Sequence, residues 1–386
     1  MSEKTFWKNL AQPIIGLAPM DGVTDAAFRA ITARHGRPDL SFTEFTSVDR
    51  IVSGYDPDLA ELRYSETERP VIAQVFGTDP ESFYQTAHLI CELGFDGIDI
   101  NMGCPSKTVA RTGAGAGLIR TPDRAREILR RTRQGISDWA AGQSIGQIGL
   151  PASVMEDVRR AKAAWFGHPP DSLLDAPRKT IPVSLKTRLG YDRIVIEDWI
   201  PSLLSESPAA ITLHGRTLAQ NYSREADWEA IARAAEIVRG SGTLILGNGD
   251  IRSAATAVRR IRETGVHGVL VGRAAMGNPW IFTLSDAIRT AVRSGQTPPT
   301  DLSISVVEKL AVALEHAAFF EQYRGKLSFR NVRKFLAAYC SGFPNASELR
   351  QHLVRVENLQ EVETILQPVA TFAAILAPTN VGVECA

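Results

Sequence analysis

The sequence predicts a (β/α)8 TIM barrel of the α/β class, followed by a smaller all-helical C-terminal domain. Two observations predict the barrel: short apolar runs recur along the first three quarters of the chain, and helix-like segments lie between them. Most of these runs are apolar on both faces, as parallel strands covered by helices are. A third observation predicts the helical domain, because strand-like runs stop after about residue 300.

The expected strands alternate with segments that carry ordinary helix start and stop signals. "DPESFYQTAHLICELG" and "SAATAVRRIRETG" open on Asp or Ser and close on Gly. Such an alternation is typical of a barrel with a helix after each strand. The alternative is a doubly wound sheet, which needs a reversal of strand order. The eight expected strands are residues 13–20, 40–45, 70–77, 97–103, 181–189, 209–215, 243–249 and 268–274.

The domain organisation follows from this alternation. We expect the barrel domain over residues 1–295 and the helical domain over residues 296–386. Residues 135–180 break the regular spacing, with Gly and Pro at both ends and a helical middle. Because this segment lies between a helix and the next strand, barrel geometry places it at the bottom face, away from the chemistry. It is either a decorative insertion or a contact for a partner.

Composition excludes several classes of protein. The 386 residues are 44% hydrophobic and 22% charged, and Lys+Arg and Asp+Glu both total 43, so net charge indicates no partner. The N-terminus has no apolar run of signal-peptide length, and "VATFAAILAP" is too short to span a bilayer. The four cysteines and seven histidines show no metal-ligand spacing. We therefore expect a cytoplasmic protein without a membrane span or a bound metal.

Polar residues gather at the carboxyl ends of the expected strands, where barrel enzymes place their catalytic groups. Gln74 and Asn101 each donate and accept hydrogen bonds, which suits the edge of a heterocycle. Lys186 suits a planar group that holds negative charge, although an internal salt bridge to a strand carboxylate is the alternative for this lysine alone. The small residues of "GNGD" and "GRAAMGNP" let backbone N–H groups approach a phosphate, and an arginine adds charge. Together these groups describe a flavin mononucleotide (FMN) at the mouth of the barrel.

A resemblance supports this interpretation. "APMDGVTDAAFR", "AQVFG", "GFDGIDINMGCPSKTV", "VSLKTRLGY", "ITLHGRT", "LILGNGDI" and "VLVGRAAMGNPW" resemble, in order, the motifs of the tRNA-dihydrouridine synthases. The resemblance implies an FMN barrel with a helical domain. It also implies reduction of the C5=C6 double bond of uridine in tRNA, with NADPH as the transient reductant of the flavin. The implied flavin contacts are Ala18, Pro19, Met20, Gln74, Lys186, His214, Asn248, Gly249, Asp250, Gly272 and Arg273.

Cys104 lies at the tip of the fourth expected strand, in "DINMGCPSK". The resemblance implies that it is the catalytic acid. Hydride delivered to C6 of uracil leaves negative charge at C5, and a thiol that is mostly protonated at neutral pH can donate the proton required there. The neighbours Gly103 and Pro105 do not lower a thiol pKa as a histidine would. The alternative is a buried, inert cysteine.

The segment "TGAGAGLI" (112–119) contains the G-x-G-x-G pattern of dinucleotide-binding folds. We reject that function because the segment starts too far after its strand and no acidic residue ends a strand at the required distance. The sequence instead indicates a flexible loop that lets Cys104 close over a flipped base.

A basic segment follows in the helical domain. "YRGKLSFRNVRKFLAAY" (323–339) holds five cations and no acid. On one helix, Arg330, Arg333 and Lys334 share a face, and such a face can follow a phosphate backbone. A solvated basic face without a ligand is the alternative. The residues expected to meet RNA or the reacting base are Asn101, Lys107, Arg111, Arg216, Arg324, Lys326, Arg330, Arg333 and Lys334.

Two other functions remain open at this stage. A flavin barrel that acts on free pyrimidines, like a dihydroorotate dehydrogenase, would not need the basic helix. A catalytically inactive, tRNA-binding relative would not need Cys104 and Lys186, and the presence of both residues argues against it.

Overall fold

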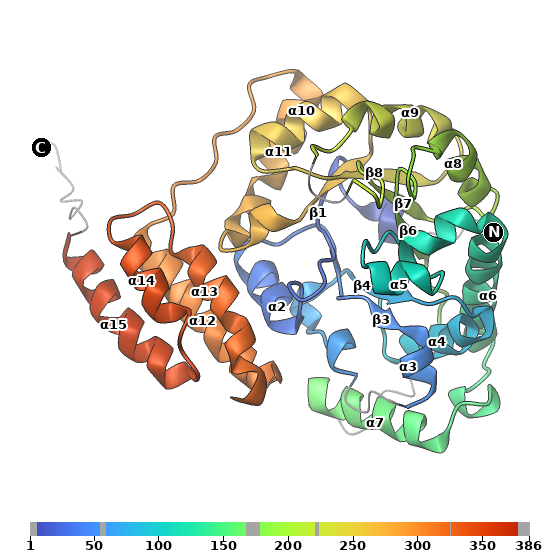
Figure 1. Ribbon diagram of the computed structural model, residues 1–386, viewed down its shortest axis with the longest axis horizontal. Helices are drawn as coiled ribbons and strands as arrows, with labels where there is room; N and C mark the ends of the chain where they lie inside the picture. Colours follow the sequence, from blue (N-terminus) through green and yellow to red (C-terminus); the bar gives the residue numbers. More distant parts are fainter. Residues whose placement is uncertain (1–5, 55–58, 167–177, 221–223, 325, 377–386) are drawn as a thin grey trace, which may run out of the picture. The chain divides into compact units, whose positions relative to one another are not determined.

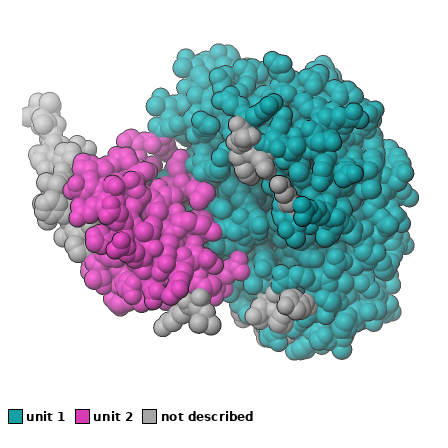
Figure 2. All heavy atoms as spheres, in the orientation of Figure 1, with its two compact units in different colours: residues 1–275, 280–301 teal, residues 276–279, 302–386 magenta. Residues whose placement is uncertain are grey.

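A computed structural model of the chain describes residues 6–54, 59–166, 178–220, 224–324 and 326–376. The chain divides into two compact units (Figure 2). Unit 1 comprises residues 1–275 and 280–301, and unit 2 comprises residues 276–279 and 302–386. The domain boundary expected at residue 296 falls in the segment that joins the last helix of unit 1 to residue 302.

Unit 1 contains the predicted barrel. All strand pairs are parallel, in the order β1-β9-β8-β7-β6-β5-β4-β2, and β3 also pairs with β4. Pairing of β1 with β9 excludes the doubly wound alternative, and two further backbone bonds bring β2 to β1: Asp39 N to Ile15 O (3.1 Å) and Leu17 N to Leu40 O (3.0 Å). The strands are β1 (Ile14–Leu17), β2 (Ser41–Phe42), β3 (Thr46–Ser47), β4 (Val71–Phe76), β5 (Gly97–Met102), β6 (Val183–Arg188), β7 (Ala210–His214), β8 (Leu244–Asn248) and β9 (Gly268–Val271).

Helices lie around the ring of strands (Figure 1). The side chains of Asp25, Asp79, Asp227 and Ser253 cap four of them by accepting a backbone N–H of the first turn. The helix that begins after Ser253 ends at Gly265, which is in the left-handed conformation. The helices of unit 1 are α1 (Phe6–Asn9), α2 (Ala26–His35), α3 (Val48–Val52), α4 (Pro80–Glu92), α5 (Lys107–Arg111), α6 (Pro122–Ala140), α7 (Ala152–Phe166), α8 (Ile196–Leu204), α9 (Trp228–Val238), α10 (Ala254–Thr264) and α11 (Ser285–Ser294).

The barrel interior changes from apolar to polar along the strands. Ile72 and Leu246 belong to a buried apolar cluster, into which Trp7 of α1 also packs. Two residues further along the same strands, and on the same face, lie Gln74 and Asn248. On these two strands the interior thus becomes polar toward the carboxyl end.

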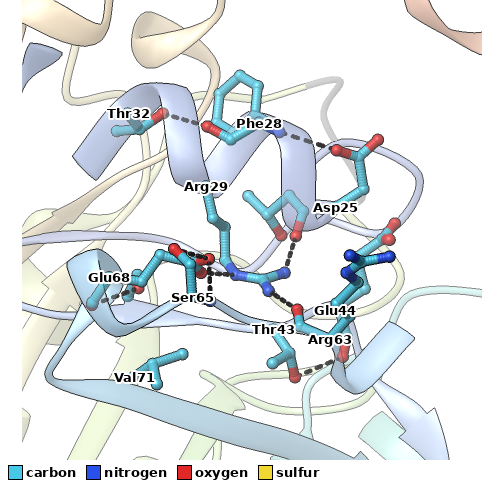
Figure 3. A network of polar contacts seen from close by, with 12 residues as sticks. Asp25, Phe28, Arg29, Thr32, Thr43, Glu44, Arg63, Ser65, Glu68 and Val71 are labelled. Carbon is cyan, nitrogen blue, oxygen red and sulfur yellow. Dashed lines mark hydrogen bonds and ion pairs between the residues drawn. The ribbon is translucent and has the colours of Figure 1, made fainter. Parts of the chain in front are cut away.

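A buried ion pair ties α2 to the chain that precedes β4 (Figure 3). Arg29 Nε lies 2.7 Å from Glu68 Oε2, and neither side chain is exposed. Arg29 also donates to the backbone carbonyls of Thr24 and Arg63, and Glu68 Oε1 accepts from Ser65 N at 2.8 Å. Because Thr24 belongs to the β1–α2 loop, one guanidinium joins that loop, α2 and the segment before β4.

The expected insertion packs at the amino ends of the strands. Its helix α7 carries Trp165 and Phe166, whose rings lie 6.0 and 5.2 Å from the ring of Tyr64. Tyr64 Oη donates to Leu93 O at 3.0 Å, just before β5. A cavity of about 820 Å³ lies here, lined in part by these aromatic side chains and by Ile181 ahead of β6. This cavity is at the opposite end of the strands from Cys104, so it is not the catalytic site.

Unit 2 is helical, as expected, but the helix expected to hold Arg330, Arg333 and Lys334 together is interrupted. Residues Lys326–Val332 form a 3-10 helix, so Arg330 precedes the α-helix that holds Arg333 and Lys334. Ser and Asn favour turns over helix interiors, which agrees with Ser328 and Asn331 in this stretch. Further along, Arg333 donates to two backbone carbonyls of a turn between two helices. The helices are α12 (Val306–Arg324), α13 (Arg333–Tyr339), α14 (Ala346–Leu353) and α15 (Leu359–Leu376).

Three general properties follow from the described residues. None of the helices seen there is long and apolar enough to cross a membrane. No cluster of His, Cys, Asp and Glu among the same residues is suited to a metal ion. Cys91, Cys104 and Cys340 are buried and unpaired.

Candidate active site

Cys104 lies in the loop after β5, and side chains of β5 and β6 hold the backbone of this loop. Asn101 Oδ1 accepts hydrogen bonds from Gly103 N (3.0 Å) and Cys104 N (2.8 Å). Arg188 Nε of β6 donates to Gly103 O at 2.6 Å, and Arg188 Nη1 donates to Thr217 O at 3.1 Å. Side chains from two strands thus fix the two peptide units that lead into the cysteine.

The environment of Cys104 keeps its thiol protonated. The residue is 5% exposed, and burial raises the pKa of the thiol above its ordinary value. A backbone hydrogen bond from Ser106 and the positive charges of Arg188 and Lys186 oppose that rise. A neutral thiol is a proton donor and a poor nucleophile. The arrangement therefore suits a general acid, as expected from the sequence.

The glycine-rich segment does not form the flexible loop expected from the sequence. Residues Gly115–Arg120 form a 3-10 helix, and residues 115–119 are buried. Gly115 has a φ of +57°, and a Cβ at this position would lie 3.0 Å from Cys104 Cβ. A Cβ at Gly117 would lie 2.8 Å from Ala110 O. Gly115 and Gly117 allow this close packing, and the segment lies buried against the cysteine.

A row of buried polar side chains crosses β4, β5 and β6. Gln74 Nε2 donates to Asp99 Oδ2 at 2.7 Å, and Ser184 Oγ donates to Asp99 Oδ1 at 2.7 Å. Asn101 Nδ2 donates to Gln74 Oε1 at 3.1 Å. Burial raises the pKa of Asp99 to about 6, against opposing hydrogen bonds from Gln74 and Ser184 and the charge of Lys186. Asp99 is therefore mostly ionised at neutral pH, and the two hydrogen bonds that it accepts hold the row together.

Lys186 offers an ammonium group to a ligand. It lies beside Asn101 in the β5–β6 register and is half-buried. Burial and the charge of Arg188 lower its pKa to about 8, so it remains mostly charged at neutral pH. No residue in the described part of the chain forms a hydrogen bond or ion pair with Nζ, so the salt bridge considered as the alternative is not found there. A half-buried cation in this state fits an anionic or electron-rich ring.

His214 is held neutral with a defined tautomer. Burial, followed by the charges of Lys186 and Arg188, lowers its pKa well below the ordinary value. Arg216 Nη1 lies 3.2 Å from His214 Nε2, and a guanidinium can only donate. Nε2 therefore accepts, and the ring proton is on Nδ1, which makes His214 a hydrogen-bond donor.

Arg216 does not lie at the rim of the barrel, where the sequence placed it for RNA contact. It is 2% exposed, and Nε donates to Arg224 O at 2.7 Å. Nη2 lies 2.6 Å from Asp250 Oδ2. Its guanidinium is used inside the barrel because Asp250 and His214 both face it. Arg216 thus orients His214 and Asp250, two expected cofactor residues, and is not available for contact with RNA at the surface.

The ends of β8 and β9 form the part of the site suited to a phosphate. Asp250 Oδ1 lies 3.1 Å from Arg273 Nη2, and the Arg273 side chain is 61% exposed. Gly249 has a φ of +127°, and a Cβ there would lie 2.7 Å from Ala226 Cβ. Trp228 Nε1 donates to Gly249 O at 3.1 Å and fixes the turn. An oriented arginine beside a tight glycine turn fits a phosphate monoester.

The end of β1 completes the ring of expected cofactor residues. Ala18 N donates to Val271 O at 2.8 Å, and Met20 N donates to Thr24 Oγ1 at 3.0 Å. A Cβ at Gly272 would lie 3.3 Å from Met20 Sδ. Pro19, between Ala18 and Met20, is half-buried, and Asn248 Nδ2 donates to Leu270 O. The expected flavin contacts on β1, β4, β6, β7, β8 and β9 all lie at the carboxyl ends of their strands.

The expected RNA contacts are distributed over both units. Arg111 is exposed at the end of α5; Lys107 begins that helix, and its side chain lies outside the described residues, as does that of Lys326. Arg324, at the end of α12, is half-buried.

The three cations expected to share a face differ in their contacts. The Arg330 side chain is 69% exposed and lies 2.8 Å from Glu357 Oε1. Lys334 is exposed. Arg333 is more buried and donates to Val356 O at 2.8 Å and Arg355 O at 2.9 Å. Arg330 and Lys334 therefore remain RNA candidates, whereas Arg333 holds the turn before α15.

Sequence reasoning assigned no role to four residues that shape the site: Asp99, Ser184, Arg188 and Gly115. Asp99 and Arg188 had a signal, since each is a charge within an otherwise apolar strand. Ser184 and Gly115 had none, because their roles depend on neighbours far along the chain.

Fold and site together define a TIM barrel with a buried cysteine after the fourth barrel strand and with cationic side chains at the carboxyl ends of its strands. The dihydrouridine synthase (Dus) family profile matches residues 16–138 and 174–375. A probable tRNA-dihydrouridine synthase of Staphylococcus aureus (strain COL) is 31% identical over 94% of this chain and 95% of its own. Probable tRNA-dihydrouridine synthase 2 of Bacillus subtilis (strain 168) is 30% identical over 94% and 96%. The chain belongs to the dihydrouridine synthase family, a family of oxidoreductases.

Solved structures give a fainter likeness. The crystal structure of DHODH from Eimeria tenella is 12% identical, with a TM-score of 0.37 over 65% of this chain and 67% of that chain. At this level the likeness carries no argument about function. The family match omits residues 139–173, which include the 3-10 helix η4 (Ile145–Gln147) and α7 of the insertion.

Proposed function

We propose that this protein reduces the C5=C6 double bond of uridine in tRNA to give dihydrouridine, with FMN as cofactor and NADPH as the electron source. The observation that carries the proposal is the buried, protonated Cys104 thiol beside Lys186 and Arg188 at the carboxyl ends of the strands. Family membership and the names of the two relatives support tRNA as the substrate. The unpaired, buried cysteines favour a reducing compartment and thus the cytoplasm.

Different residues of the site would bind different parts of FMN. Lys186 and the Nδ1–H of His214 would face the negative edge of the ring system, and Gln74 would meet its polar edge. Arg273, held by Asp250, would bind the phosphate, with the turns at Gly249 and Gly272 next to it. Bound FMN supplies the hydride that reaches C6 of uracil.

Cys104 supplies the other hydrogen. Its Sγ–H bond breaks, the proton forms a bond to C5, and the electron pair stays on sulfur as a thiolate. Lys186 and Arg188 stabilise that thiolate because their positive charges favour the ionised form. Water then returns a proton to the thiolate.

The direct test uses purified protein with FMN, NADPH and an unmodified tRNA transcript. Nucleoside mass spectrometry is expected to show uridine converted to a product heavier by two hydrogens, and only with both NADPH and the folded tRNA. Conversion of free uridine or orotate at the same rate would favour the small-pyrimidine alternative. Binding of tRNA without any conversion would favour the inactive RNA-binding alternative.

Arg273→Gln is expected to weaken FMN binding about 10-fold or more, because one charge-assisted hydrogen bond to phosphate is lost. Fluorescence titration of flavin-free protein with FMN measures this. Riboflavin, which lacks the phosphate, is expected to bind both proteins equally.

Arg239→Gln is the matched control for Arg273→Gln. Arg239 is exposed and paired with Glu236 at the end of α9, before β8 begins at the other end of the barrel. It is expected to leave FMN affinity unchanged. Equal weakening of FMN and riboflavin by Arg273→Gln would contradict the phosphate role.

Arg330→Gln with Lys334→Gln is expected to weaken tRNA binding and to reduce its salt dependence. Each phosphate contact that is lost lowers the slope of log K against log salt by roughly 0.7–0.9. Glu357→Gln is the opposing control: it removes the carboxylate that pairs with Arg330 and is expected to strengthen tRNA binding. Filter binding over a salt series measures both, and wild-type affinity of the double variant at low salt would remove this surface from the proposal.

A further inference from the structure

Asp99 is a buried carboxylate that the proposed chemistry does not use. It lies in the middle of β5 and has no exposed surface. Its neighbours in register are Gln74 on β4 and Ser184 on β6, and each donates one hydrogen bond of 2.7 Å to it. Charged side chains are rarely fully buried unless they are paired or hydrogen-bonded, because removing a charge from water costs free energy.

A chain of hydrogen bonds connects Asp99 to the cysteine loop through Gln74 and Asn101, and the donor and acceptor at each step are defined. An ionised carboxylate only accepts, so Gln74 must turn its NH2 group to Asp99 and its oxygen to Asn101. Asn101 then donates through Nδ2 to Gln74 and turns Oδ1 to the loop. There Oδ1 accepts from Gly103 N and Cys104 N.

We propose that Asp99 is a positioning residue that fixes the Cys104 loop by setting the orientation of the Gln74 and Asn101 amides in turn. All four side chains are buried, so each amide takes its orientation from its protein neighbours. If Gln74 reversed, its NH2 group would face the NH2 group of Asn101. If Asn101 reversed, its NH2 group would face two backbone N–H groups.

The inference rests on the proposed function only in that Cys104 is taken as the proton donor. Its test reads backbone amides instead of turnover. Full activity of a Cys104→Ala variant would overturn the proton-donor role and leave the orientation of the amides untouched, so the two failures are distinguishable.

The experiment is hydrogen exchange, measured by mass spectrometry, on FMN-loaded protein carrying Asp99→Leu. Leucine removes the acceptor and keeps similar volume. Exchange at Gly103 N and Cys104 N is expected to become about 2- to 10-fold faster, the range for loss of one hydrogen bond. Asp99→Asn keeps an oxygen that can accept from Gln74, so this conservative variant is expected to restore slow exchange.

Ser184→Ala is the matched control, because it removes the hydrogen bond to the other oxygen of the same carboxylate. It is expected to leave exchange at residues 103 and 104 at the wild-type rate. Gln74→Met removes the next member of the chain and is expected to speed exchange as Asp99→Leu does. In a Gln74→Met background, Asp99→Leu is expected to add nothing, because both changes act through Asn101.

Three results would overturn the inference. One is wild-type exchange at residues 103 and 104 in folded Asp99→Leu protein. A second is fast exchange in Asp99→Asn equal to that of the leucine variant. The third is an additive effect in the double variant. If Asp99→Leu does not fold, the Gln74→Met variant is the test. Wild-type exchange at residues 103 and 104 in that variant would then overturn the inference.

Discussion

Cys104→Ala is expected to lower the rate of uridine reduction about 10²- to 10⁴-fold, the contribution of a positioned general acid. The side chain is nearly fully buried and the pKa of its thiol is raised, so the substitution removes a buried, protonated thiol. FMN content and the rate of NADPH-dependent flavin reduction are expected to stay at wild-type values, since Cys104 is not among the proposed flavin contacts. Rapid-mixing absorbance of the flavin and nucleoside mass spectrometry of the tRNA measure the two half-reactions separately.

Cys91→Ala is the matched control. Cys91 is a buried cysteine on α4 that borders the cavity at the opposite end of the strands. Its removal is expected to leave uridine reduction unchanged apart from a small loss of stability. Equal loss in both variants would show a general effect of removing a buried thiol, and full activity of Cys104→Ala would contradict the proton-donor role.

Arg29→Met is expected to destabilise the barrel unit by about 3–5 kcal/mol, because it leaves the carboxylate of Glu68 buried without its partner. The double variant Arg29→Met with Glu68→Met is expected to recover much of that loss, since it removes both charges together. Thermal unfolding followed by circular dichroism measures the change, and a double-mutant cycle gives the coupling between the two residues.

The same substitution is expected to reduce FMN retention at a temperature where the barrel remains folded. Arg29 Nη1 holds Thr24 O, and Thr24 Oγ1 accepts from Met20 N in the loop after β1. Purification with FMN and measurement of the flavin-to-protein ratio tests this. Equal destabilisation by the single and double variants would contradict the ion-pair account, and an unchanged flavin ratio would remove the link to the loop.

The fold was predictable because its main signals are local. Each expected strand contains an observed one, since runs such as "PVIAQVFG" are apolar on both faces and bounded by turn residues. Placing Gln74, Lys186 and His214 at one end needed only the topology, because parallel strands direct their carboxyl ends the same way.

The partners within the site were not predictable. Arg216 was expected at the rim because arginine is usually exposed, but Asp250, which binds it, is 34 residues further along the chain. The bond from Ser184 to Asp99 spans 85 residues. A glycine-rich run was interpreted as flexible because glycine permits many conformations, whereas Gly115 is glycine because Cys104 lies against it.

The rigid 3-10 turn under Cys104 also bears on which nucleotides can react. Gly115 packs against Cys104, and Asn101 and Arg188 hold the backbone that leads into it, so under the proposed function we expect the base to move to the sulfur. The displacement falls on the RNA, whose uracil must leave its stacked neighbours and enter from outside. Unstacking costs least where a nucleotide is already unpaired, so uridines in bends and loops of the folded tRNA are favoured over those in its double-stranded stems.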